Sequence, residues 1–230
     1  YTILGIGLYA PRTVKVYDYL DELLGNAPID AVVLRTHIGN MTQGDCKITG
    51  PSVYRNATHR YQVSIVDALD YVQSRQAKFS GMQLMVSFTM AAFWGRPLKK
   101  YDEQFPIGKD CAVLFESHMK SVCLTYKMYI GNVVPDLHVM MHYNASRGVF
   151  NAYDNDLTIK WKICSATKEH PNLQFGVALF HLEYEDGQKV CLHKGSDFRR
   201  AAGYYRLEAV SKYIKNVIRD PGFFTKNISC

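Results

Sequence analysis

The sequence lacks most of the features that assign a protein to a class directly. It contains no uninterrupted apolar run of about 18 residues, so no membrane-spanning helix is expected. It contains no Cys-x-x-Cys pair, no Cys/His spacing of the zinc type and no glycine-rich phosphate loop, so neither a metal nor a cofactor is expected. It also has no initiator methionine and no signal peptide, from which we expect a mature or processed product.

A strong charge of either sign is absent as well. The formal net charge of the 230 residues is +6, and the basic pairs Lys99-Lys100 and Arg199-Arg200 are short. Such pairs are typical of solvated surface rather than of a nucleic-acid interface, so no nucleic-acid partner is expected. A mildly basic protein can still bind acidic glycans or cell surfaces.

Cysteines and acceptor sites for N-linked glycans are plentiful by contrast. Six cysteines with no zinc-type spacing indicate disulfide bonds, and together with Asn-x-Ser/Thr sequons they favour a secreted, extracellular glycoprotein. The cysteines are Cys46, Cys111, Cys123, Cys164, Cys191 and Cys230, and the predicted glycosylation sites are Asn40, Asn56, Asn144 and Asn227.

Apolar runs that alternate with helix-like segments predict an α/β fold with a parallel sheet. The strands of a parallel sheet are buried on both faces and therefore form continuous apolar runs. Helices are predicted over ranges 16–24, 64–73, 154–164 and 207–217; Gly25 offers a cap to the first, and the second begins with a capping-box-like Ser64-Ile65-Val66-Asp67. The predicted strands are Tyr1–Ala10, Ile29–Ile38, Met82–Thr89 and Phe175–Leu182.

The range 107–149 differs in character from the rest. It is rich in Tyr, Met and Val and contains short strand-like runs at 123–130 and 136–143. These runs indicate a small mixed insertion rather than another strand–helix unit of the main sheet.

The order of these segments resembles the C-terminal half of a family-18 glycoside hydrolase, the chitinase and chitinase-like family. TILGIGLYAP resembles the fifth barrel strand, IDAVVLRTHIGNM the sixth, GMQLMVSFTMAAFWG the seventh and LQFGVALFHLEYED the eighth, while RRAAGYYRLEAVSKYIKNV resembles the closing helix. The resemblance implies half of a TIM (β/α)8 barrel, namely the four β/α units of strands five to eight, with a small α+β insertion. The implied domains are 1–106, the insertion 107–149, and 150–230 with the last barrel helix, the eighth strand and the terminal helix.

The resemblance also implies that catalytic residues are missing. The acid of this family ends an Asp-x-x-Asp-x-Asp-x-Glu motif on the fourth strand, and no such motif occurs in this chain. The Met-x-Tyr-Asp that usually ends the sixth strand is replaced by Arg35, His37 and Ile38. Ala91 and Phe93 occupy the places of the Tyr and Arg that follow the seventh strand, and Phe180 occupies that of the eighth-strand Trp.

In this family one cysteine of the insertion pairs with a cysteine just after the eighth strand. Cys191 fits the second position, and either Cys111 or Cys123 fits the first. The resemblance therefore implies that a disulfide bond connects the insertion to the segment after the last strand.

Several side chains could line a ligand site. Arg35 and His37 lie on one face of the sixth-strand run and suit an anion at the barrel mouth, although a hydrogen-bonded structural pair is the plainer interpretation. Glu183 follows the last strand, where barrel enzymes place catalytic groups, but it has no partner acid. His138 and His142 have metal-ligand spacing only if helical, and their run is strand-like. An aromatic cleft could be formed by Phe88, Phe93, Trp94 and Phe180, which are otherwise core residues.

The sequence thus predicts a secreted, non-catalytic chitinase-like glycoprotein that binds glycan or protein ligands. One alternative is the C-terminal chain of a cleaved chitinase-type hydrolase whose acid motif lies on another chain. A second alternative is a structural or host-directed interaction protein of an arthropod secretion. Four parallel strands leave two open edges, so we expect the chain to associate with a partner that covers them. The first choice is an N-terminal half-barrel chain, and the second is another copy of this chain. The third choice is a different sheet order that covers both edges within this chain.

Overall fold

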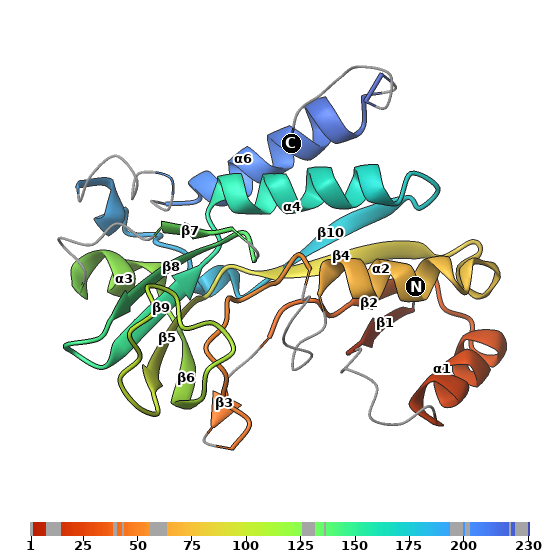
Figure 1. The fold of residues 1–230 in the computed structure, drawn as a ribbon. Helices are drawn as coiled ribbons and strands as arrows, with labels where there is room; N and C mark the ends of the chain where they lie inside the picture. Colours follow the sequence, from red (N-terminus) through yellow and green to blue (C-terminus); the bar gives the residue numbers. More distant parts are fainter. Residues whose placement is uncertain are drawn as a thin grey trace.

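The computed structural model describes two sheets with helices around them (Figure 1). The described residues are 2–7, 15–38, 41–42, 44–55, 64–125, 132–135, 137–193, 200, 203–220, 222–223 and 230. None of the helices formed by these residues is long and apolar enough to cross a membrane.

The first sheet is parallel and contains all four predicted strands. Its order is β1-β2-β4-β10, which is the order of the strands along the chain. The strands are β1 (Ile3–Ile6), β2 (Ala31–Leu34), β4 (Gln83–Thr89) and β10 (Phe175–Phe180). The prediction of a parallel α/β sheet is confirmed, although β1 and β2 are shorter than their apolar runs.

Helices cover this sheet and are close to the predicted positions. They are α1 (Lys15–Asn26), α2 (Ile65–Gln73), α4 (Asp156–Glu169) and α6 (Tyr205–Tyr213), which continues into a π-helical turn η4 (Ile214–Ile218). The Ser64 side chain caps α2 by accepting from the Asp67 N–H, and the Asp67 carboxylate accepts from the Ser64 N–H, as the capping box predicts. Gly25 lies inside the last turn of α1 and is not its cap.

Apolar side chains from these helices form the core on the parallel sheet. α2 contributes Leu69 and Val72, and α4 contributes Ile159 and Ile163, all of which are buried in one cluster with apolar residues of β2 and β4. Leu157 of α4 lies outside this core, with half of its surface exposed. The reason is that the buried stripe of α4 begins at Ile159 and repeats at Ile163 and Ala166, which places Leu157 on the outer side.

The second sheet is antiparallel and contains six strands in the order β3-β6-β5-β9-β8-β7. It lies at one end of the parallel sheet, where the chain passes from β4 into β5 (Figure 1). The strands are β3 (Met41–Thr42), β5 (Ala92–Pro97), β6 (Cys111–Ser117), β7 (Asn132–Val134), β8 (Val139–Asn144) and β9 (Val149–Tyr153). It therefore takes strands from both inside and outside the range 107–149.

One predicted strand of this region is a helix in part. The run 123–130 was expected to be a strand, but its first residues belong to α3 (Met119–Thr125), and 126–130 fall outside the described residues. Val122 and Cys123 of α3 pack on Met140 and Tyr153 of the second sheet. Packing of the helix on that face therefore overrides the strand preference of the local sequence.

Buried charged side chains join the two sheets. The Arg206 guanidinium is fully buried and donates to the carbonyl oxygens of Met90 and Asp154 at 2.6 Å each, and it pairs with Glu185 at 3.0 Å. Lys162 is equally buried and donates to the Asp154 carboxylate at 2.5 Å. Since Met90 lies between β4 and β5, and Asp154 between β9 and α4, these contacts hold the junction of the sheets together.

Three disulfide bonds connect all the cysteines: Cys46–Cys111, Cys123–Cys191 and Cys164–Cys230. The bond between Cys123 and Cys191 is one of the two pairings that the family resemblance implied. It ties α3, which covers the second sheet, to the short helix η3 (Val190–His193) that follows the parallel sheet.

The glycan acceptor sites can be placed only in part. Asn144 ends β8 and is half-buried, and its side-chain oxygen accepts from the Ser146 hydroxyl at 2.8 Å. Asn40, Asn56 and Asn227 lie outside the described residues. Glycosylation at all four positions stays a prediction.

Candidate functional site

The candidate site lies at the carboxyl edge of the parallel sheet. In barrels built from β/α units, this edge is where sites are formed. His37 follows β2, Thr89 ends β4, Phe180 ends β10 and His181 comes directly after it, so three neighbouring strands bring side chains to one place. We call the group Arg35, His37, Phe180 and His181 the edge cluster.

His37 is held tightly at the centre of the edge cluster. Only 5% of its surface is exposed, and its Nδ1 lies 2.6 Å from Ser87 Oγ, which itself accepts from the Thr36 N–H at 2.9 Å. Burial lowers the pKa of His37 to about 4, with smaller contributions from the nearby charges of Arg35 and His181. His37 is therefore neutral near pH 7.

Ser87 and His37 do not form a pair of catalytic nucleophile and general base. Ser87 is completely buried, and its backbone N–H and C=O are both bonded to the Thr36 hydroxyl. Because the Ser87 oxygen already accepts from the Thr36 N–H, its hydroxyl is free to donate to His37 Nδ1. Ser87 thus orients the imidazole and offers no surface to a substrate.

His181 connects the edge cluster to the second sheet. It has a left-handed backbone (φ 58°), and its Nδ1 lies 2.8 Å from the Thr89 hydroxyl and 3.4 Å from the Glu116 carboxylate on β6. Its ring also packs edge-on against His37 and Tyr184, with centroids 5.8 Å away in each case. The two sheets therefore contribute opposite sides of one polar and aromatic site.

The predicted ligand residues are brought together only in part. His37 and Phe180 meet at the edge cluster, where their rings lie 4.7 Å apart, and the exposed Arg35 is near enough for its charge to act on His37. Glu183 is exposed on the next turn, η2 (Leu182–Tyr184).

The other predicted aromatic residues lie elsewhere. Phe88 and Phe93 are fully buried in the cores of the first and second sheets, respectively. Trp94 stacks against Phe115 on the face of β5 opposite to that of Phe93, since successive side chains of a strand alternate.

Sequence reasoning missed His181, Glu116 and Tyr184. His181 directly follows a predicted strand, so the rule that selected Glu183 could also have found it. Glu116 belongs to a strand of the second sheet, and no local pattern connects it with residue 181.

The side chains at this edge are basic and aromatic. It offers a guanidinium, imidazoles and exposed aromatic surface, with 39% of the Phe180 surface accessible. His181 is spaced to pair with the Glu116 carboxylate. Within the described residues, no group of three or more His, Cys, Asp or Glu side chains is arranged to hold a metal ion.

Comparison with known proteins gives a fold. No family model and no curated protein matches the sequence. Among solved structures, a family GH18 chitinase from Cycas revoluta in complex with (GlcNAc)3 superposes with a TM-score of 0.59 at 11% identity, over 91% of this chain and 54% of that one. The chain has a GH18 chitinase-like fold.

Two further structures agree with this assignment. A chitinase-like agglutinin from Robinia pseudoacacia matches with a TM-score of 0.56 at 14% identity, over 90% of this chain and 55% of its own. A chitinase from Rhizomucor miehei matches with a TM-score of 0.55 at 14% identity, over 86% of this chain and 61% of its own. The chitinase-like fold of this chain thus spans little more than half the length of the proteins it resembles.

Proposed function

We propose that this chain is a secreted, non-catalytic chitinase-like glycoprotein that binds a glycan or a protein ligand at the edge cluster. The observation that carries the proposal is the composition of the carboxyl edge of the parallel sheet. Arg35, a buried neutral His37 and Phe180 stand there, in the places where the family resemblance calls for Met, Tyr and Trp, and Ile38 stands in the place of the Asp. The three disulfide bonds are compatible with an extracellular protein.

We also propose that the parallel sheet corresponds to strands five to eight of a TIM barrel, and that the range 107–149 is the core of the inserted domain. The collinear order of β1, β2, β4 and β10, with α1, α2 and α4 between consecutive strands of this sheet, supports this correspondence. In that frame the edge cluster occupies the mouth of the barrel.

The binding proposal is tested with chitin oligosaccharides and a glycan array on the native glycoprotein. We expect no turnover of a fluorogenic chitobioside, because no acid motif is present. We expect Phe180→Ala to weaken ligand binding about fivefold, since an aromatic contact contributes about 1 kcal/mol. Phe115→Ala is the matched control, because Phe115 is similarly exposed but lies on the face of β6 opposite to Glu116, the residue of this strand that approaches the edge cluster.

Two outcomes would contradict the binding proposal. Turnover of the chitobioside by this chain, lost in Glu183→Gln, would make it an enzyme. Equal loss of binding in Phe115→Ala and Phe180→Ala would place the ligand elsewhere.

The edges of the parallel sheet favour a further partner. Ile3 on β1 is 58% exposed, and no residue of β10 is fully buried, whereas all of β2 is. Within the part of the chain that the structure describes, no strand pairs with the outer side of β1 or β10. Parallel strands are normally covered on both faces, so further β/α units are the natural complement.

We therefore expect the folded unit to contain an N-terminal half-barrel or, as a second choice, a second copy of this chain. Such an N-terminal half could also supply the acid motif. The complex of the two chains would then be an enzyme, which is the alternative to the binding proposal. Light scattering on native material measures the mass. A stable monomer near 26.2 kDa plus glycan, with no co-purifying chain, would contradict the expectation.

A further inference from the structure

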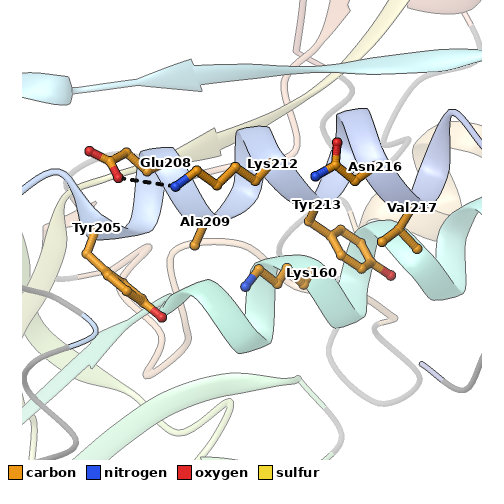
Figure 2. Close-up of a pocket in the computed structure, with 8 residues that line it drawn as sticks. All are labelled: Lys160, Tyr205, Glu208, Ala209, Lys212, Tyr213, Asn216 and Val217. Atoms are coloured by element: carbon orange, nitrogen blue, oxygen red, sulfur yellow. Dashed lines mark ion pairs between the residues drawn. The ribbon is translucent and has the colours of Figure 1, made fainter.

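A groove on the outside of the helical layer is separate from the edge cluster. It has a volume of about 380 Å³ and lies between α4 and α6, which pack side by side (Figure 2). Lys160 comes from α4, and the other lining residues come from α6 and its π-helical continuation: Tyr205, Glu208, Ala209, Lys212, Tyr213, Asn216 and Val217.

The backbone of α6 shapes this groove. The segment Ile214–Ile218 is π-helical, and such turns are rare and are frequently found at functional sites. Asn216 and Val217 belong to this turn and line the groove. Tyr205 and Tyr213 lie about two turns apart on the same helix, so the groove has an aromatic ring toward each end (Figure 2).

The charge of the groove is positive at the α4 side. Lys160 pairs with the Asp156 carboxylate at 2.8 Å, but Arg200 binds the same carboxylate at 3.1 Å. One fully buried carboxylate is thus shared by two cations, which leaves an excess positive charge beside the groove. On α6, Lys212 lies 3.8 Å from Glu208, and both side chains are more than two-thirds exposed, so this pair is weak.

We propose that the α4–α6 groove binds an acidic saccharide, that is, a sugar chain carrying sulfate or carboxylate groups. The tyrosine rings offer flat apolar surface to the faces of the sugar rings. The Asn216 amide can donate to and accept from hydroxyl groups, and the two lysines meet the acidic groups. The excess positive charge around Asp156 and the weakness of the Lys212–Glu208 pair favour an acidic ligand over a neutral sugar.

The binding site is independent of the proposed function, because the groove and the edge cluster share no residue. The test is calorimetric titration of the native glycoprotein with a heparin-derived tetrasaccharide, in parallel with the desulfated tetrasaccharide. We expect the sulfated probe to bind and the desulfated probe to bind at least tenfold more weakly. Phe180→Ala should leave this binding unchanged, so failure at one site is distinguishable from failure at the other.

Substitutions locate the site. Lys160→Gln and Lys212→Gln should each weaken binding of the sulfated probe about tenfold, because a hydrogen bond to a charged group contributes about 1.5 kcal/mol or more. Tyr205→Ala should weaken it as well. Lys215→Gln is the matched control, since Lys215 is exposed on the same helical segment but does not line the groove. Thermal unfolding of each variant verifies that the fold is intact.

Three results would overturn the proposal. Equal weakening by Lys215→Gln and Lys212→Gln would show diffuse attraction to a basic surface. Equal affinity for the sulfated and desulfated probes would show that the groove does not recognise the acidic groups. Binding of a single-stranded oligonucleotide as tightly as the tetrasaccharide, unaffected by Tyr205→Ala, would point to a polyanion of another class.

Discussion

Arg206→Leu is expected to lower the free energy of unfolding by about 3–5 kcal/mol, since breaking a buried ion pair from one side leaves the other charge without compensation. Arg206 is fully buried, and it supplies Glu185 with an opposite charge and two backbone carbonyls with donors. Burial already raises the pKa of Glu185, and Arg206 opposes this effect. Urea unfolding of the variant measures the loss.

The matched control for this prediction is Arg219→Leu. Arg219 is an exposed arginine just after the π-helical turn, and its replacement should change the stability by less than about 0.5 kcal/mol. The double variant Arg206→Leu/Glu185→Leu should be less destabilised than Arg206→Leu alone, because the uncompensated carboxylate is gone. An Arg206→Leu protein with the unfolding midpoint of the parent would show that this guanidinium does not hold the junction of the two sheets.

Removing the Cys123–Cys191 bond is expected to cost about 4 kcal/mol and to lower the melting temperature by about 10 °C. The bond joins cysteines 68 residues apart, so its loss gives the unfolded chain more freedom. The variant Cys123→Ala/Cys191→Ala, followed by calorimetry, tests this. It should also loosen α3, which packs on Met140 and Tyr153, so amide exchange in Met119–Thr125 should quicken.

The control for the disulfide prediction uses the same protein. α2, which is capped by Ser64 and carries neither cysteine, serves as the internal control. Its amide exchange should quicken only as far as global unfolding becomes more frequent. A melting temperature within about 2 °C of the parent would contradict the expected constraint.

The parallel sheet could be predicted because its signal is local. A strand such as β2, in which every residue is buried, must be a continuous apolar run, and Ile29–Ile38 contains one. The capping box at Ser64 is equally local, since its two hydrogen bonds connect residues three apart. Both predictions depend on neighbours in sequence, and both are confirmed.

The candidate site was harder to predict because its members come from distant segments. Glu116 reaches His181 only because β6 of the second sheet stands beside the end of β10. Phe93 and Trp94 show the same difficulty: β5 was not predicted as a strand, so nothing indicated that the two rings lie on opposite faces. The strand prediction for the run 123–130 was wrong at its first residues for a related reason, since packing against the second sheet stabilises the helix α3 there.

The pattern of the disulfide bonds has a consequence for proteolysis. Cys164 lies between Cys123 and Cys191 in the sequence, so the bonds Cys123–Cys191 and Cys164–Cys230 overlap. Every peptide bond from 46 to 111 and from 123 to 230 is therefore spanned by at least one disulfide bond. A single cut within those ranges leaves the two pieces covalently joined until the disulfide bond is reduced. The short stretch between Cys111 and Cys123 is not spanned, and a cut there would separate the chain into two disulfide-bonded parts.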